Sequence, residues 1–61
     1  MTATNMEKYA CAKRELSQRE RVYPRLIEQG KMTKEFAATQ IALMAEIADD
    51  YRKLYESERL L

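Results

Sequence analysis

The sequence contains no histidine and only one residue each of cysteine, glycine and proline. Without histidine, and with a single thiol, the chain has no plausible ligand set for zinc or haem, so we expect no metal site and no cofactor. One isolated glycine excludes a glycine-rich phosphate loop. Cys11 cannot form an internal disulfide, which is typical of a protein in a reducing cytoplasm.

Long apolar runs are also missing. The longest uncharged run covers residues 36–45, which is too short to cross a bilayer, and no signal-peptide pattern precedes it. We therefore expect a cytoplasmic protein with no membrane partner. A content of 46% hydrophobic and 34% charged residues is typical of a helical bundle rather than a disordered chain. The 61 residues allow one small domain, with residues 1–4 frayed.

Catalytic patterns are equally scarce. The neighbouring carboxylates Asp49 and Asp50, and the pair Glu46 and Asp50 one turn apart, have the composition of a cation site but lack a loop of oxygen ligands. They are interpreted as a solvated helix face. Ser17 and Ser57 have no base in a recognisable pattern. We predict that the chain is not an enzyme and has no catalytic residue.

What the sequence does contain is helical periodicity, most clearly over residues 33–59. Thr33 is a suitable N-cap, Glu35 complements the helix dipole, and no glycine or proline interrupts the run as far as Glu58. One apolar line repeats at spacings of four and three and predicts a seam against another helix: Ala37, Ile41, Met44, Ala48, Tyr51 and Tyr55. A second line lies on an adjacent face: Phe36, Leu43, Ile47 and Leu54.

A first helix is predicted over residues 5–29, capped by Thr4 or Asn5 and rich in helix formers. Pro24 leaves two alternatives: the helix ends near Val22 and restarts, or one kinked helix continues. Tyr9, Leu16 and Tyr23 are seven residues apart and share one face. Gly30 supplies a left-handed position that ends the helix, and the short turn before Thr33 makes the two helices antiparallel neighbours. The predicted fold is an all-α antiparallel hairpin, kinked or broken at Pro24.

Charge is distributed unevenly between the two halves. Residues 1–31 contain seven Lys and Arg against four Glu, whereas residues 32–61 contain four against six acidic residues. The two predicted helices should therefore attract each other. Folding at the turn is expected to place Lys13 and Arg14 beside Asp49 and Asp50, and Arg19 or Glu20 beside Leu43 or Met44.

A lone hairpin of this length has one internal seam and exposes both outer faces, and no disulfide or metal compensates for its small core. We therefore predict that two copies pair into a four-helix bundle as a homodimer. The expected oligomer or partner contacts are Phe36, Leu43, Ile47 and Leu54, with Tyr51 and Tyr55 toward the helix end. Arg14, Arg21 and Arg25 share a face of the first helix and are the expected polar contacts.

Residues 19–53 carry a distinctive set of short motifs: Val22-Tyr23-Pro24 after a basic residue, Gly30-x-Met32, Ile41-Ala42-x-Met44, and Ile47-x-x-Asp50-Tyr51-Arg52. This pattern resembles a family of small helical proteins encoded by tailed phages and prophages of proteobacteria. The resemblance implies an accessory phage product that binds a host protein, and it transfers no catalytic or binding residue. Phe36 departs from the family pattern, in which a polar residue is common at this place.

Three functions therefore remain open. The first is a non-enzymatic accessory protein that self-associates and modulates or inhibits a host protein through a helix face. The second is a nucleic-acid-binding accessory protein that uses Arg14, Arg21 and Arg25, although glutamates are interleaved with these arginines. The third is a structural, bundle-forming component of a larger assembly.

Overall fold

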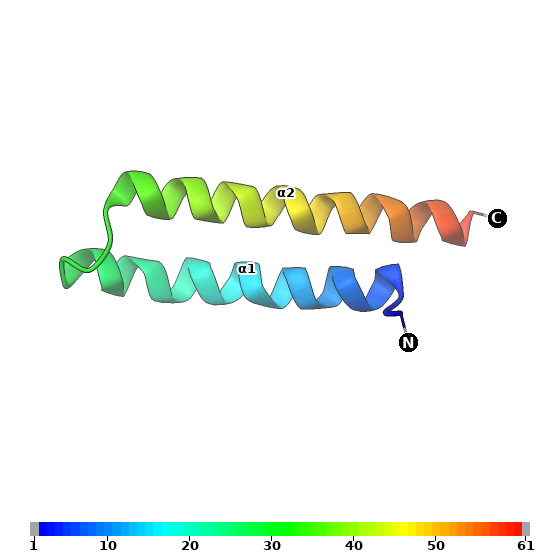
Figure 1. The fold of residues 1–61 in the computed structure, drawn as a ribbon, viewed down its shortest axis with the longest axis horizontal. Coiled ribbons are helices and arrows are strands. Elements are labelled where there is room, and N and C mark those ends of the chain that lie inside the picture. Colours follow the sequence, from blue (N-terminus) through cyan, green and yellow to red (C-terminus); the bar gives the residue numbers. More distant parts are fainter. Residues whose placement is uncertain (1, 61) are drawn as a thin grey trace.

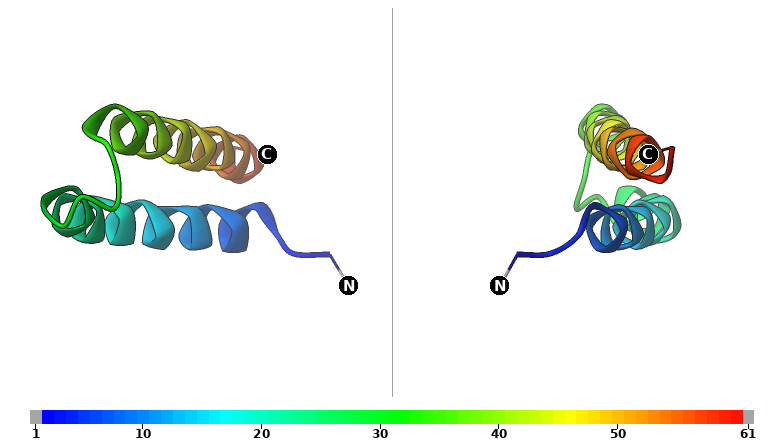
Figure 2. Two further views of the ribbon diagram at one scale, coloured as in Figure 1. Left: turned by 60° about the vertical axis from the view of Figure 1, so that its left-hand side comes forward. Right: turned by 90° about the vertical axis from the view of Figure 1, so that its right-hand side faces the viewer.

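The computed structural model describes residues 2–60, which form two antiparallel helices joined by a short turn (Figure 1). Helix α1 covers Asn5–Glu28 and helix α2 covers Lys34–Arg59. The principal extents are 48 × 20 × 16 Å, and Figure 2 shows the two helices as a single layer. Within the described residues no further element covers either face of this layer. The predicted all-α hairpin is confirmed.

Helix α1 begins with a capping box in which two residues satisfy each other's backbone donors. The backbone N–H of Glu7 donates to Thr4 Oγ1 at 3.1 Å, and the backbone N–H of Thr4 donates to Glu7 Oε1 at 3.0 Å. These bonds replace helix partners that the first turn lacks. Thr4, rather than Asn5, is therefore the N-cap.

The capping box makes the first turn of α1 sensitive to acid. The hydrogen bond from the Thr4 backbone, followed by that from its side chain, lowers the pKa of Glu7. A carboxylate with a lowered folded pKa stabilises the helix end above its unfolded pKa, about 4.3 for Glu, and this contribution is lost as the pH falls through the folded value. Acid by itself slows the intrinsic exchange of amide hydrogens with solvent. After correction for this effect, we expect the Thr4 amide to be less protected from exchange at about pH 3 than at neutral pH, because its hydrogen bond to Glu7 is weakened.

Glu7→Gln is the matched control for this prediction, because glutamine also accepts the Thr4 N–H bond but does not titrate. Amide hydrogen exchange of residues 4–8, corrected for intrinsic rates, should show the acid-dependent loss in the parent chain only. The same acid response in both chains would show that the Thr4–Glu7 box is not its source.

Pro24 lies inside α1, which continues through it to Glu28. The alternative of a helix that ends near Val22 and restarts is therefore wrong. Proline lacks the N–H that would donate to the carbonyl of Glu20, but Glu20 and Pro24 are both exposed, so water can reach this carbonyl. Leu26 and Ile27 are half-buried beyond the proline, and their packing favours continuation of the helix.

The turn between the helices is closed by Gly30, which has φ +70° as expected for a left-handed C-terminal position. Its N–H donates to the Ile27 carbonyl at 3.0 Å, and the next N–H, of Lys31, donates to the Leu26 carbonyl at 2.9 Å. This pair of bonds is a Schellman motif. Thr33 then caps α2, accepting the Phe36 N–H at 3.1 Å. Both sequence-based predictions at this turn are confirmed.

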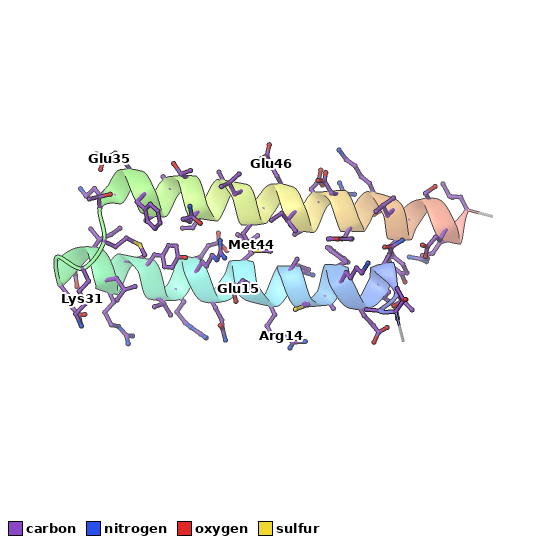
Figure 3. The ribbon with its side chains drawn as sticks, viewed as in Figure 1. Arg14, Glu15, Lys31, Glu35, Met44 and Glu46 are labelled. Carbon is purple, nitrogen blue, oxygen red and sulfur yellow. The ribbon has the colours of Figure 1, made fainter. Side chains whose placement is uncertain are left out.

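The core is a narrow seam between the helices. Ala37, Met44 and Ala48 of α2 are buried, and Ile41, Tyr51 and Tyr55 are half-buried, which confirms the predicted seam. On α1, Ala12 is buried, while Tyr9, Leu16 and Tyr23 are half-buried. Ala12, Met44 and Ala48 form the central cluster, against which Leu16 packs. Figure 3 shows Met44 between the two helices. Alanines occupy most of the fully buried positions, and the larger seam residues other than Met44 are only half-buried at its edges.

The helices are aligned by polar contacts at the edges of this seam. Arg19 Nη1 donates to the backbone carbonyl of Gln40 at 2.9 Å. Asn5 Nδ2 donates to Glu58 near the two chain ends. The sequence places Arg19 beside Leu43 or Met44, and the contact with Gln40 is about one turn closer to the loop. The long arginine side chain reaches this part-buried carbonyl at the edge of the seam, and spacing in the sequence does not encode that reach.

Ion pairs within residues 2–60 join positions three or four apart on the same helix: Glu15–Arg19, Asp49–Arg52, Asp49–Lys53 and Arg52–Glu56. The expected pairing of Lys13 and Arg14 with Asp49 and Asp50 is therefore wrong. Hydrogen bonds from Arg52 and then Lys53 lower the pKa of Asp49, since both partners are held nearby by helix geometry. Lys13 Nζ lies instead 5.6 Å from the ring centre of Tyr9.

Candidate interaction surface

Four large apolar side chains of α2 stay exposed although they lie next to the core. Phe36, Leu43, Ile47 and Leu54, here called the α2 stripe, are between 44% and 54% exposed. Their spacings of seven, four and seven residues place them on one helix face, over a length of roughly 27 Å. The predicted second apolar line is thus confirmed as an exposed surface, separate from the buried seam.

An apolar groove adjoins the stripe. It has a volume of about 450 Å³ and is lined by Met44 and Tyr51 of α2 and by residues of α1 and its lead-in: Ala3, Glu7, Lys8, Cys11, Ala12 and Glu15. Ile47 lies three residues after Met44 and four before Tyr51, so these side chains are neighbours on the helix surface. The stripe and the groove therefore form one continuous face of the hairpin, with apolar side chains concentrated on α2.

The α1 side of this groove was not predicted from the sequence. The single cysteine, Cys11, is exposed. Lys8 Nζ lies 5.6 Å from the ring centre of Tyr51 and covers part of it. The sequence does contain a signal for two residues of this side. Lys8 and Glu15 are seven positions apart and directly precede the seam residues Tyr9 and Leu16, which places both at the edge of the seam.

Tyr51 and Tyr55, proposed as interface residues, are half-buried against α1. Arg59 also lies over the ring of Tyr55, with its guanidinium carbon 5.5 Å from the ring centre. Both tyrosines therefore belong first to the seam of the hairpin. Tyr51 lies four residues after Ile47 and three before Leu54, so the exposed part of its ring adjoins the α2 stripe.

The three arginines lie elsewhere. Arg14, Arg21 and Arg25 are exposed, and helical spacing places them on one face of α1, opposite the residues that pack on α2. Figure 3 shows Arg14 pointing away from α2. None of the three takes part in the ion pairs of residues 2–60. The structure therefore gathers them into a basic stripe but does not bring them next to the α2 stripe.

Three titratable groups in the described part of the chain have pKa values shifted by contacts within their own helix or its cap. Resolved pKa shifts concern Glu7, Asp49 and Arg52, and hydrogen bonds to residues three or four positions away account for each. Residues 2–60 contain no buried charged side chain and no group of three acidic, cysteine or histidine residues placed to hold a metal ion.

Neither helix within residues 2–60 is both long enough and apolar enough to cross a lipid bilayer. Comparison with protein-family models, with curated proteins and with solved structures finds no match for this chain.

Proposed function

We propose that this chain is a non-enzymatic interaction protein that self-associates into a four-helix bundle and binds a partner protein through a helix face. The supporting observation is the exposure of the α2 stripe beside a very small core. Within residues 2–60 the buried residues are three alanines and Met44, whereas the four stripe residues retain about half of their surface in water. Contiguous exposed apolar surface of this kind marks protein–protein interaction sites.

Energetics support the self-association part of this proposal. Full burial of one Leu, Ile or Phe side chain contributes about 1.5–3 kcal/mol, and the stripe offers four partly exposed ones per chain. Domains of this size seldom have more than a few kcal/mol of stability from their own core. Pairing of two hairpins along the stripe would supply the missing burial and shield the apolar surface from water.

The motif resemblance over residues 19–53 extends the proposal to a phage-type accessory protein in the bacterial cytoplasm. Its partner would then be a host protein whose activity it modulates or inhibits. Phe36 adds apolar surface at the loop end of the stripe, with 54% of its surface exposed. Arg21 and Arg25, on the outer side of α1 near the turn, would add polar contacts that select the partner.

One observation favours nucleic acid as a second candidate partner. Arg14, Arg21 and Arg25 are exposed, share a face and form no ion pair with other residues of the 2–60 range. Such a basic stripe suits phosphate binding. Glu7 and Glu28 lie on or next to the same face by helical spacing, and they reduce its charge. The apolar stripe therefore carries the first proposal. Co-purification with particles would instead favour a structural component of a larger assembly.

Affinity capture with matched baits tests the proposed function. The parent chain is used on nuclease-treated proteobacterial lysate beside Leu43→Asp/Ile47→Asp and beside Ala38→Asp/Ala45→Asp, which alters exposed residues on the opposite side of α2. We expect a protein retained by the parent and by the alanine-site variant, but lost from the stripe variant, because the partner would bind a helix face that only the assembled bundle presents. In a parallel capture from untreated lysate, retention that survives both variants and disappears after nuclease treatment would assign binding to the arginines instead.

A further inference from the structure

We infer that the occupant of the α2 stripe is a second copy of α2, packed antiparallel about a twofold axis level with Ala45. This inference rests on the proposed self-association and adds its geometry. In the resulting pair, Phe36 of one copy lies level with Leu54 of the other, and Leu43 lies level with Ile47.

The spacing of the stripe carries this inference. A twofold interface must be self-complementary, because the same surface supplies both sides of it. Leu43 and Ile47 each lie two residues from Ala45, on opposite sides, and Phe36 and Leu54 each lie nine residues from it. Reversing the direction of α2 therefore places every stripe residue opposite another stripe residue. A pairing with the same helix direction also places each stripe residue opposite a stripe residue, its own copy, but it brings Glu35 and Lys53 each level with a like charge.

The distribution of exposed apolar residues favours α2 over α1 as the surface that covers the stripe. Among the large hydrophobic residues that stay exposed in the described chain, α1 contributes only Met6 and Val22. These two are sixteen positions apart, which does not match the stripe. A second α2 supplies four apolar side chains over the same length. The same twofold axis brings α1 over the partner's α1, so the assembly is a four-helix bundle.

Charged residues at the border of the stripe fit this register on one side. Glu35 and Lys53 are exposed and lie on the same side of the stripe by helical spacing. In the antiparallel pair Lys53 is level, to within about two residues, with Glu35 of the other copy, so opposite charges adjoin. The two copies of Glu46 come near each other at the axis, and this like-charge pair weakens the dimer.

Disulfide trapping tests the register. In a Cys11→Ala background, one chain carries Leu43→Cys and an N-terminal mass tag, and another carries Ile47→Cys. After mixing and oxidation in a glutathione buffer, non-reducing electrophoresis separates the mixed product from the two products of like chains. In the inferred register Leu43 of one copy is level with Ile47 of the other. The two copies of Leu43, or of Ile47, are instead offset by about 6 Å along the helix axis. That offset is unfavourable for a disulfide.

The expected result is a large excess of the mixed disulfide over random pairing, together with a several-fold tighter dimer for Glu46→Gln, measured by sedimentation. A dimer of the correct mass whose like-chain disulfides form as readily as mixed ones would overturn the register and leave the proposed self-association standing. A parent chain that is monomeric at all concentrations would overturn both.

Discussion

Replacing Leu43 and Ile47 together by aspartate is expected to dissociate the proposed dimer and to unfold most of the helix at micromolar concentration. Both copies lose two apolar side chains from the centre of the stripe and gain charges that the interface would have to bury. Each of these side chains is already about half-buried in the hairpin, so pairing contributes about half of the 1.5–3 kcal/mol for full burial. Four side chains then account for about 3–6 kcal/mol, or about two to four powers of ten in Kd. Light scattering should report a change from about twice the chain mass of 7.2 kDa to the single-chain value.

Ala38→Asp/Ala45→Asp is the control for this result. It adds the same charge to the same helix, but both alanines are exposed and lie away from the stripe. Its mass and helical circular dichroism should stay close to those of the parent. Equal effects of the two double variants would mean that added charge or lost helix propensity, and not the stripe, controls assembly.

Features decided by local chemistry could be predicted from the sequence. Thr33 and Gly30 are found in the predicted capping roles, because a hydroxyl at a helix start and a left-handed glycine at a helix end each satisfy backbone groups only a few residues away. Pro24 was harder to interpret. The backbone hydrogen bond that proline removes favours a break in the helix. Burial of Leu26 and Ile27 beyond it favours continuation, and this burial depends on tertiary structure, which the local sequence does not show.

Polar contacts made by long side chains could not be predicted from the sequence, because they depend on how far each side chain reaches in the folded hairpin. Arg19 bonds to the carbonyl of Gln40, and Asp49 pairs within its own helix rather than across the hairpin. Attraction between a basic and an acidic helix is non-directional, whereas an ion pair needs two side chains that are already close. Neighbours three or four positions away meet that condition at the lowest cost in side-chain entropy.

One part of the candidate site, the α2 stripe, could be predicted from the sequence, and another part, the groove, could not. The stripe followed from periodicity, because positions seven, four and seven apart must share a helix face. The groove beside it did not, since it depends on which residues of α1 pack opposite Met44 and Tyr51. A hairpin with alanine-rich contacts keeps its helices close and leaves large side chains outside. The same sequence feature that narrows the core thus produces the surface available to another molecule.

Met44→Ala is expected to destabilise the fold by about 2–3 kcal/mol, toward the lower end of the range for deleting a large buried side chain. Met44 is only 9% exposed and is the one large side chain in the central cluster. Its neighbours Ala12 and Ala48 each have a single methyl group as side chain, which cannot extend to fill the space. The groove next to Met44 is open, however, so the helices can partly close over the gap, which keeps the loss moderate.

Urea unfolding followed by circular dichroism measures this loss, at one fixed protein concentration because association contributes to the apparent stability. Met6→Ala removes the same atoms from a site that is 51% exposed and should change the free energy of unfolding by less than about 0.5 kcal/mol. Met44→Leu keeps the volume and should restore most of the stability. If Met44→Ala and Met6→Ala were equally mild, the seam would contribute little, and the stripe shared between two copies would have to provide nearly all the stability of the hairpin.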